Sequence, residues 1–95
     1  MKVRWLAKAL DDLESVFEFI AEENPKVARD MAQRVWSAAR ALAEHPGMGR
    51  PGRVQGTRER VITGTPYLVV YRVRHEVEIL RVLHGAMRWP PGDKP

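Results

Sequence analysis

The fold of this chain is decided by residues 66–84, which read PYLVVYRVRHEVEILRVLH. Two apolar runs rich in β-branched residues predict two strands, and each run is interrupted by an arginine, Arg72 or Arg81. Arginine is rarely buried without a partner, and its guanidinium binds carboxylates and phosphates well. The two arginines therefore indicate either structural ion pairs or contacts to an anionic partner.

The two strands are expected at residues 67–73 and 77–84, and the connection at 74–76 leaves their register open by one residue. A two-residue turn puts Arg72 and Arg81 on one face of the hairpin. The same face then carries Leu68, Val70, Val77, Ile79 and Leu83. The opposite face carries Tyr67, Val69, Tyr71, Val73, Glu78, Leu80, Val82 and His84. A three-residue turn would flip one strand and separate the two arginines.

With the two-residue turn, Tyr67 and His84 lie opposite or nearly opposite each other. Imidazole titrates near neutrality and a phenol can donate a hydrogen bond, so His84 is the candidate catalytic residue of this hairpin. The structural alternative is a histidine that ends a strand and bonds to a backbone carbonyl. Glu78 beside Arg72 or Arg81 would likewise form a cross-strand ion pair without any catalytic role.

The first half of the chain predicts a short edge strand at residues 2–5 and two amphipathic helices. Asn24 followed by Pro25 predicts the N-cap and the first helical position of the second helix. The short link between the helices predicts an antiparallel hairpin. The apolar stripe of the first helix is expected to be Leu10, Leu13, Phe17 and Ile20, and that of the second Ala28, Met31, Val35, Ala38 and Leu42.

Residues 45–56 (HPGMGRPGRVQG) hold four glycines and two prolines, which predicts a loop. A strand is expected to start within residues 59–63, followed by a turn at 64–66. The predicted order is therefore β-α-α-β-β-β, in which a helical hairpin packs on a small, mostly antiparallel sheet. This is an α+β fold, and the 95 residues are expected to form one domain.

Composition excludes several classes of site. The chain has no cysteine, so it holds no disulfide, thiolate or cysteine-based zinc site, and its three histidines lack metal-ligand spacing. We expect no metal and no cofactor. No apolar run approaches the length of a membrane span, and the N-terminal segment turns acidic too soon for a signal peptide. The expected location is the cytoplasm.

Charge is distributed unevenly along the chain. Residues 1–45 carry seven basic and eight acidic side chains, a net charge of −1, whereas residues 46–95 carry nine and four, a net charge of +5. This asymmetry indicates a surface for a polyanion or for an acidic protein. The alternative is a general bias toward arginine that serves solubility alone.

Several short motifs, in this order and spacing, are shared with a known family. They are Asp12-Leu13, Asn24-Pro25, residues 43–49 (AEHPGMG), Tyr71-Arg72-Val73 and residues 77–84 (VEILRVLH). With its helix pair, basic loop and paired strands, the chain resembles the RelE/ParE family of small bacterial toxins over nearly its whole length. The family fold has the same β-α-α-β-β-β order.

The resemblance implies a type II toxin–antitoxin module. In such a module the toxin arrests growth, and an antitoxin neutralises it by wrapping an extended, often acidic C-terminal segment around it. The basic second half fits an acidic partner and a nucleic-acid-bearing target. We therefore expect a cognate antitoxin as partner, and DNA gyrase or the ribosome with its mRNA as target, with no role for a membrane.

The family divides by target. Ribosome-dependent mRNA endonucleases like RelE typically carry an arginine just after the first residue of the strand that ends in Val-Tyr, where this chain has Leu68. They also place Arg, His, Tyr or Lys near the C-terminus, which only His84, with Arg81 and Arg88 nearby, matches here. The ParE branch, whose members poison gyrase without a catalytic site, matches better through His-Pro-Gly-Met-Gly and Arg-Val-Leu-His.

The expected function is therefore gyrase inhibition, and the alternative is metal-free RNA cleavage with His84 as the catalytic residue. Whether the protein is an enzyme stays open at this point. A third reading is a non-toxic nucleic-acid-binding module that uses the arginines of residues 50–60 on phosphates. The residues expected to bind the target or the antitoxin are Arg58, Arg60, Arg72, Arg81 and Arg88.

Overall fold

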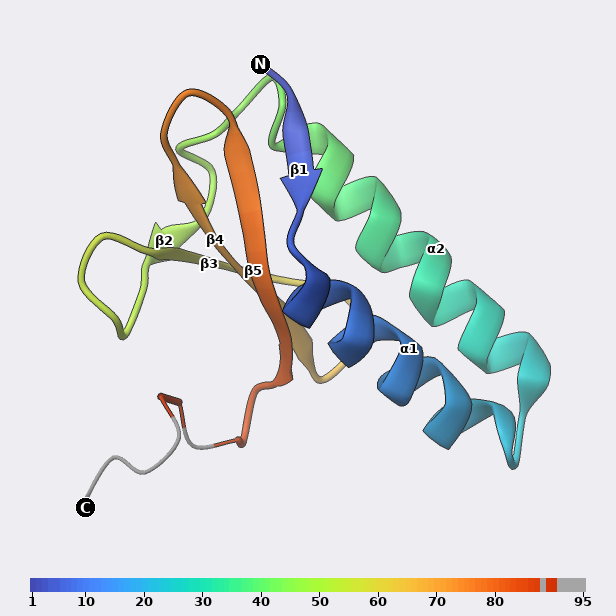
Figure 1. Cartoon of the computed structure of the whole chain (residues 1–95). Helices are drawn as coiled ribbons and strands as arrows, with labels where there is room; N and C mark the ends of the chain where they lie inside the picture. Colours follow the sequence, from blue (N-terminus) through green and yellow to red (C-terminus); the bar gives the residue numbers. More distant parts are fainter. Residues whose placement is uncertain (88, 91–95) are drawn as a thin grey trace.

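Two helices cover one face of a five-stranded sheet in the computed structural model, which describes residues 1–87 and 89–90 (Figure 1). The strands are Val3–Trp5 (β1), Arg50–Pro51 (β2), Arg58–Val61 (β3), Tyr67–Val73 (β4) and Val77–His84 (β5), in the order β1-β5-β4-β3-β2. β1 runs parallel to β5, and the other neighbours are antiparallel. The predicted α+β fold is confirmed.

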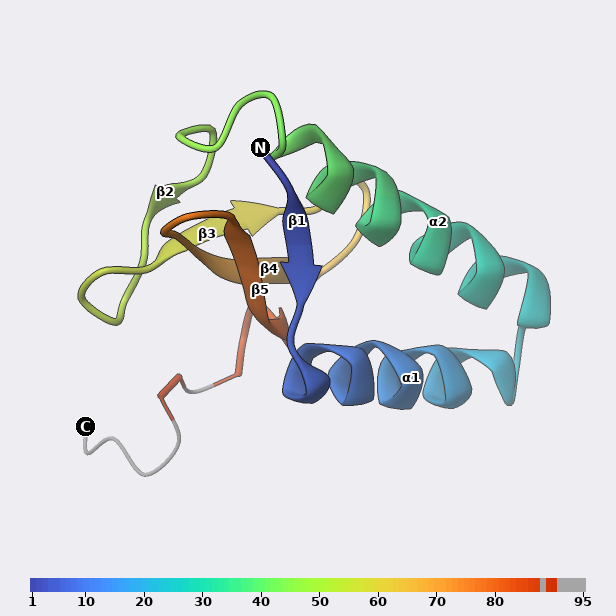
Figure 2. The ribbon, with the colours of Figure 1, turned by 45° about the horizontal axis from the view of Figure 1, so that its top comes forward.

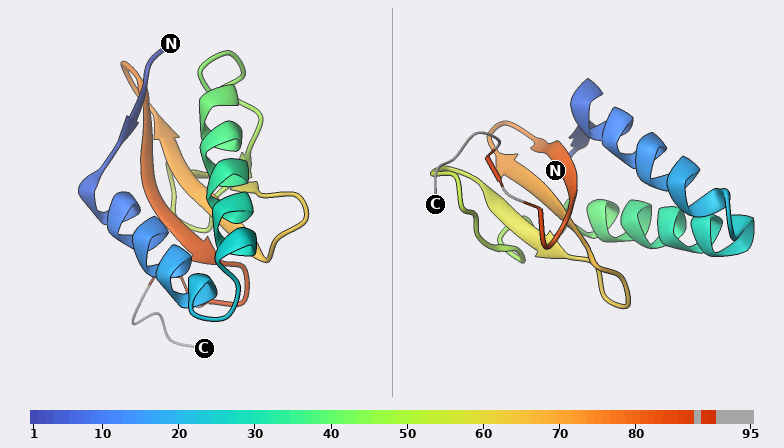
Figure 3. Two further views of the ribbon diagram at one scale, coloured as in Figure 1. Left: turned by 90° about the vertical axis from the view of Figure 1, so that its right-hand side faces the viewer. Right: turned by 90° about the horizontal axis from the view of Figure 1, so that it is seen from below.

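The helices are α1, Ala7–Ala21, and α2, Pro25–Ala41, and they form the expected hairpin. The Val27 N–H donates to the Asn24 side chain at 3.1 Å, and Pro25 occupies the first turn, where a missing N–H costs no hydrogen bond. Figure 3 shows both helices on the same side of the sheet.

The apolar stripes of both helices lie largely where their spacing predicts, and in α1 the expected Leu13, Phe17 and Ile20 all pack in the core. Leu13 is buried, whereas Leu10 is 43% exposed, so Leu10 was wrongly predicted as a core residue. The fully buried Ala9 takes its place. A small side chain at position 9 lets the α1 backbone approach the sheet closely, and the neighbouring Leu10 is then turned to the edge of the stripe.

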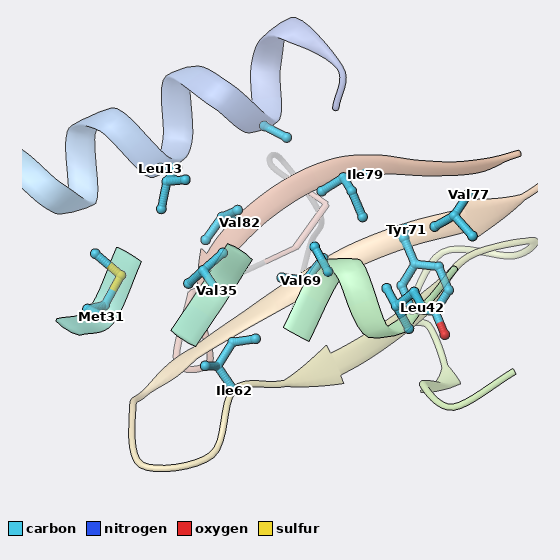
Figure 4. Close-up of a cluster of buried hydrophobic side chains, with 12 residues drawn as sticks. Leu13, Met31, Val35, Leu42, Ile62, Val69, Tyr71, Val77, Ile79 and Val82 are labelled. Carbon is cyan, nitrogen blue, oxygen red and sulfur yellow. The ribbon is translucent and has the colours of Figure 1, made fainter. Parts of the chain in front are cut away.

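The main core lies between the helices and the sheet (Figure 4). Leu13, Met31, Val35 and Leu42 point from the helical side toward side chains of the sheet. The facing residues are Ile62, Val69, Tyr71, Val77, Ile79 and Val82. Each fully buried aliphatic side chain of this kind contributes about 1.5–3 kcal/mol, so these contacts are what hold the hairpin to the sheet.

The connection between β4 and β5 is the three-residue turn, one of the two alternatives that the sequence left open. Val73 pairs with Val77, which leaves three residues in the turn. Val77 and Ile79 therefore face the helices, and Glu78 and Leu80 face away, the reverse of the predicted faces. The register was undetermined because both alternating faces of this hairpin are rich in apolar residues.

A β-bulge then shifts the pairing by a second residue. Val70 pairs with Arg81 and Tyr71 with Ile79, so Leu80 is an extra residue in β5. The bulge cancels the shift caused by the three-residue turn, and Arg81 returns to the face of Arg72, as expected. Further along the same pair, Tyr67 lies directly opposite His84, which confirms that part of the prediction.

The outer face of the sheet, away from the helices, carries a second apolar cluster of Leu68, Val70 and Leu83, with Leu80 packed against it. Trp89 covers this cluster, and the Arg81 guanidinium carbon lies 5.1 Å from the centre of its ring. In Figure 1 the segment after β5 leaves the sheet on the side away from the helices. Trp89 therefore packs on the outer face of the sheet.

The glycine-rich segment at 45–56 is mostly loop, but it contains the short strand β2, which the sequence did not predict. β2 pairs with the start of β3, and β3 itself begins at Arg58 and ends at Val61, earlier than expected. Figure 2 shows β2 and β3 at the edge of the sheet opposite to β1. None of the helices described here has the length and apolar character needed to cross a membrane.

Asp12 of α1 joins the helical layer to β5. Its carboxylate accepts hydrogen bonds from Arg81 Nε at 2.6 Å, from Arg81 Nη2 at 3.1 Å and from the backbone N–H of Val82 at 3.0 Å. Both side chains are largely buried, with 14% of Asp12 and 16% of Arg81 exposed. The Asp12-Leu13 motif thus supplies one charged anchor and one core residue.

We predict that Asp12→Ala lowers the free energy of unfolding by about 1.5–3 kcal/mol, because it removes a charged acceptor and leaves partly buried donors unpaired. Urea denaturation followed by circular dichroism measures this change. Asp11→Ala, at the exposed neighbouring position, is the matched control and should stay within about 0.5 kcal/mol of the parent. Equal losses in both variants would show that the Asp12 contacts contribute nothing.

Candidate functional site

The His-Pro-Gly-Met-Gly loop is held on the sheet by Tyr71, which is fully buried. The Tyr71 hydroxyl donates to the Pro46 carbonyl at 2.7 Å and accepts from the Gly49 N–H at 2.8 Å. A Cβ atom at Gly49 would lie 2.7 Å from the Tyr71 ring, so only glycine fits at this position. The close packing against Tyr71 therefore explains the second glycine of this motif.

Two of the predicted binding arginines, Arg58 and Arg60, lie on β3 and bond to backbone carbonyls. Arg58 Nη1 donates to Gly49 O at 2.8 Å, which fixes the same loop from a second side. Arg60 Nη1 donates to Ala38 O at 2.6 Å, which links β3 to α2. Both side chains are half-buried, and each therefore has a framework role whatever else it binds.

Glu59, between these two arginines, is only 2% exposed. It binds two arginines of the loop at residues 45–56, which we call the basic loop. It accepts from Arg50 Nη2 at 3.2 Å and from both the backbone N–H and the Nε of Arg53, at 3.0 and 3.1 Å. Burial alone would raise the pKa of Glu59, but the hydrogen bonds from Arg53 and Arg50 together outweigh it and lower the pKa below its usual value. Arg53 also donates to Met87 O at 3.3 Å, which ties the tail to this loop.

Arg72 pairs with Glu78 directly across the β4–β5 hairpin. The Arg72 hydrogen bond is the main reason that the pKa of the Glu78 carboxyl is lowered, and Arg74 and Arg4 add smaller attractions. The expected cross-strand ion pair is confirmed. Arg72 thus lies on the outer face, where the Glu78 carboxylate already neutralises its charge.

Arg81 shares the outer face with Arg72, and its guanidinium reaches round the sheet edge to Asp12 of α1. The hydrogen bond to Asp12 raises the pKa of Arg81 above its usual value despite burial, so its charge is permanent. Arg88, the last of the predicted binding residues, lies outside the described residues.

His84 is exposed at the end of β5, and its ring meets that of Tyr67 edge to face at 5.6 Å between centres. His84 Nδ1 accepts from the backbone N–H of Ala86 at 3.0 Å, so the neutral imidazole carries its proton on Nε2. The structure therefore brings together the predicted Tyr67–His84 pair. His84 Nε2 forms no hydrogen bond with the described residues.

The predicted site residues do not converge on one cleft. Arg58 and Arg60 hold β3 to the loop and to α2, whereas Arg72 and Arg81 hold outer-face and edge positions through carboxylate partners. Within residues 1–87 and 89–90, no three His, Asp or Glu side chains are grouped so as to hold a metal ion. The sequence analysis included Arg50 and Arg53 among the arginines of residues 50–60, but it missed Glu59, their partner, although an acid between arginines in a strand was a visible signal.

Comparison with known proteins gives the family. A family model described as "ParE toxin of type II toxin-antitoxin system, parDE" matches residues 3–89. The chain belongs to the ParE toxin family. The expected RelE/ParE relationship is thereby confirmed, and the fold, loop and hairpin described above are those of a ParE family member.

Curated relatives and a solved structure agree with this ParE family membership. Y4kP of Sinorhizobium fredii (strain NBRC 101917 / NGR234) is 40% identical over 89 residues, which are 94% of this chain and 93% of Y4kP. Toxin RelE2 and toxin ParE1 of Caulobacter vibrioides are 35% and 33% identical, over 90% and 84% of this chain and 96% and 84% of their own lengths. The solved structure "Chromosomal ParDE TA system from P. aeruginosa" matches with a TM-score of 0.79 and 27% identity, over 88% of this chain and 95% of that one.

The lowered pKa of Glu59 predicts an acid-sensitive contribution to stability. Because the folded-state pKa lies below the unfolded value of about 4.3, the ionised carboxylate stabilises the fold above that pH, and this stabilisation is lost as the pH falls through the folded pKa. Glu59→Gln should therefore be less stable than the parent at pH 7. The difference should shrink between about pH 5 and pH 3.

Urea unfolding at a series of pH values measures this convergence. Glu14→Gln, at an exposed position on α1, is the control and should follow the parent at every pH. A stability gap between Glu59→Gln and the parent that stays constant or widens on acidification contradicts the assigned role of the buried carboxylate.

Proposed function

We propose that this chain is the toxin of a type II toxin–antitoxin module, that it arrests growth by inhibiting DNA gyrase, and that a cognate antitoxin neutralises it. The ParE family membership supports the module and the partner. The excess of nine basic over four acidic residues in residues 46–95 suits an acidic antitoxin segment and a target that carries nucleic acid. Both targets weighed above are cytoplasmic, and the chain is expected to act there.

The observation that carries the gyrase proposal is the state of the outer face of the sheet. Leu68 stands where RelE-type endonucleases typically have an arginine, and it is 2% exposed in an apolar cluster. Arg81 and Arg72 are each bound to a carboxylate. Metal-free RNA cleavage needs cations directed at the phosphate that becomes charged in the transition state. A face whose described arginines are already paired suits a toxin that binds its target without cleaving RNA.

The second candidate function, ribosome-dependent mRNA cleavage, is favoured by His84 alone. Its Nε2 is free of described partners, and the Tyr67 ring stands beside it. An exposed imidazole at this position is suited to donate a proton to a leaving oxygen. Only RNA cleavage needs a proton donor at His84, so a substitution of His84 distinguishes the two functions.

We predict that the purified chain blocks supercoiling of relaxed plasmid by gyrase, or leaves cleaved plasmid in the presence of gyrase. His84→Ala should keep this effect, because a protein that acts by binding has no need of a proton donor there. Messenger RNA incubated with translating ribosomes and the chain should stay intact. Agarose gels of the plasmid and primer extension on the mRNA give the two readouts.

His75→Ala, in the exposed turn between β4 and β5, is the matched histidine control for both assays. Cuts in the mRNA that require ribosomes, persist in His75→Ala and vanish in His84→Ala would overturn the gyrase assignment and establish an endonuclease. Growth that continues normally when the chain is expressed alone would count against any toxin function.

A further inference from the structure

Charged side chains form a row across three strands on the outer face of the sheet. Arg4 of β1 lies opposite Glu78 of β5, and Glu78 in turn lies opposite Arg72 of β4. Residues paired across neighbouring strands point to the same face, so the three side chains are aligned at the strand spacing of about 5 Å. Arg74, in the turn that follows β4, also approaches the Glu78 carboxylate. Figure 1 shows this turn beside the start of β1, at one end of the sheet.

We call Arg4, Arg72, Arg74 and Glu78 together the Glu78 cluster. The Glu78 side chain is only 10% exposed and accepts a hydrogen bond from Arg72. Arg4 Nη1 and Arg74 Nη1 each lie 4.0 Å from a Glu78 carboxylate oxygen, which is too far for a hydrogen bond. Their side chains are 62% and 59% exposed. The carboxylate thus attracts both guanidinium groups without occupying their N–H donors.

Positive charge exceeds negative charge at this end of the outer face. Besides Glu78, the acidic residue there is Glu76, whose carboxylate lies 3.7 Å from Arg4. Lys2 precedes Arg4 by two residues, and its carbonyl accepts the Val77 N–H at 2.8 Å, so strand alternation puts the exposed Lys2 side chain on the same face. The three arginines and this lysine therefore outnumber the two carboxylates.

A second carboxylate on the outer face is surrounded by arginines in the same way. Glu59 pairs with Val70, a member of the outer-face cluster, and it binds Arg50 and Arg53. β3 and β5 lie two strand spacings apart, and the two glutamates are offset by two residues along β4, so they are separated by about 12 Å. The major groove of duplex DNA is about 12 Å wide, so each of the two basic groups can meet one of the backbones that border it.

The chemistry of the Glu78 cluster fits phosphate better than a peptide. A stable protein–protein interface has an apolar centre, whereas the side chains of this cluster are all charged. Interfaces with DNA are more polar and more positively charged. The planar guanidinium group also matches the oxygens of a phosphate, and Arg4 and Arg74 hold N–H donors in excess of their contacts to carboxylates.

We propose that the Glu78 cluster binds the phosphate backbone of duplex DNA, with Arg4 and Arg74 donating to phosphate oxygens. This inference rests on the gyrase inhibition proposed above, and it assigns the toxin a direct contact with the DNA on which gyrase acts. The contact is independent of base sequence, because groups that reach only phosphates do not read base edges. It involves no proton transfer, which agrees with a toxin that binds without catalysis.

The test measures binding of the full chain to a labelled DNA duplex of about twenty base pairs, by fluorescence anisotropy at several salt concentrations. Arg4→Gln combined with Arg74→Gln should weaken binding about tenfold or more. The slope of log affinity against log salt should become shallower by about two, because two phosphate contacts and their released counterions are lost. Lys8→Gln combined with Arg29→Gln removes two exposed charges from the helices and is the matched control, which should bind within about twofold of the parent.

A variant that retains both charges separates phosphate binding from structural effects. Arg4→Lys combined with Arg74→Lys should bind the duplex within about threefold of the parent, because the charge is kept. Thermal unfolding shows whether each variant is folded. If the glutamine double variant does not fold, Arg74→Gln alone, in the exposed turn, replaces it, and the slope should then change by about one. Duplex binding that is equal in the parent, the glutamine variant and the control overturns the proposal, while gyrase inhibition stands if supercoiling is still blocked.

Other ligands of the Glu78 cluster would give different results. A single-stranded RNA of the same length that binds more tightly than the duplex, and is released in the glutamine variant, would assign the cluster to RNA and overturn the DNA contact. Loss of binding to the protein encoded by the adjacent reading frame, with duplex binding kept, would assign it to an acidic protein instead. A parent chain that binds duplex DNA through these arginines yet leaves gyrase unaffected would overturn the proposed function and leave the DNA contact standing.

Discussion

One carboxylate, that of Asp12, fixes how the helical layer meets the sheet. β1 covers the edge of β5 only from Val77 to Ile79, and beyond that point α1 lies along the edge. Asp12 accepts the Val82 N–H there, as the carbonyl of a neighbouring strand would. The same carboxylate draws Arg81 round the edge, and Arg81 in turn lies against Trp89. The helix, the edge and the outer-face cluster are thus held by one chain of contacts.

Fewer arginines of residues 46–95 are free to bind a partner than the sequence alone indicates. Within the described strands and the basic loop, Arg50, Arg53, Arg72 and Arg81 each reach a carboxylate, and Arg58 and Arg60 bond backbone carbonyls. An arginine held in this way still contributes to the surrounding potential, but its geometry is fixed by the fold. This fixed geometry is the reason that we propose a binding role, rather than phosphate chemistry, for the outer face of the sheet.

The elements of the fold were predictable because their signals are local. Asn24-Pro25 marks the start of α2 by capping, and the bounds of β4 and β5 follow from two runs rich in β-branched residues. The turn length and the bulge at Leu80 were not predictable, because with apolar residues on both faces the alternation does not say which face is inside. The short strand β2 has no pattern of its own and exists because β3 and Glu59 hold it.

The candidate site was predictable in its residues but not in their partners. Tyr67 and His84 were paired on the basis of a two-residue turn, and the pairing holds because the bulge at Leu80 compensates for the three-residue turn. The partner of Arg81 is Asp12, 69 residues away, and no local pattern connects them. Leu10 was misplaced because positions 9 and 10 lie four and three residues before Leu13, so helical spacing alone does not say that Ala9 is the buried one.

The hydroxyl of Tyr71 has a further effect on how this chain tolerates changes of length. It bonds to the Pro46 carbonyl and to the Gly49 N–H, so both bonds can form only when the number of residues between Pro46 and Gly49 is the present one. An insertion between these two positions would release one end of the bridge inside the core. An insertion near Gln55 and Gly56, where nothing lies within 4 Å of the Gly56 Cβ direction, would leave the bridge untouched. We therefore expect insertions to be tolerated in the second part of the loop at 45–56 and not between Pro46 and Gly49.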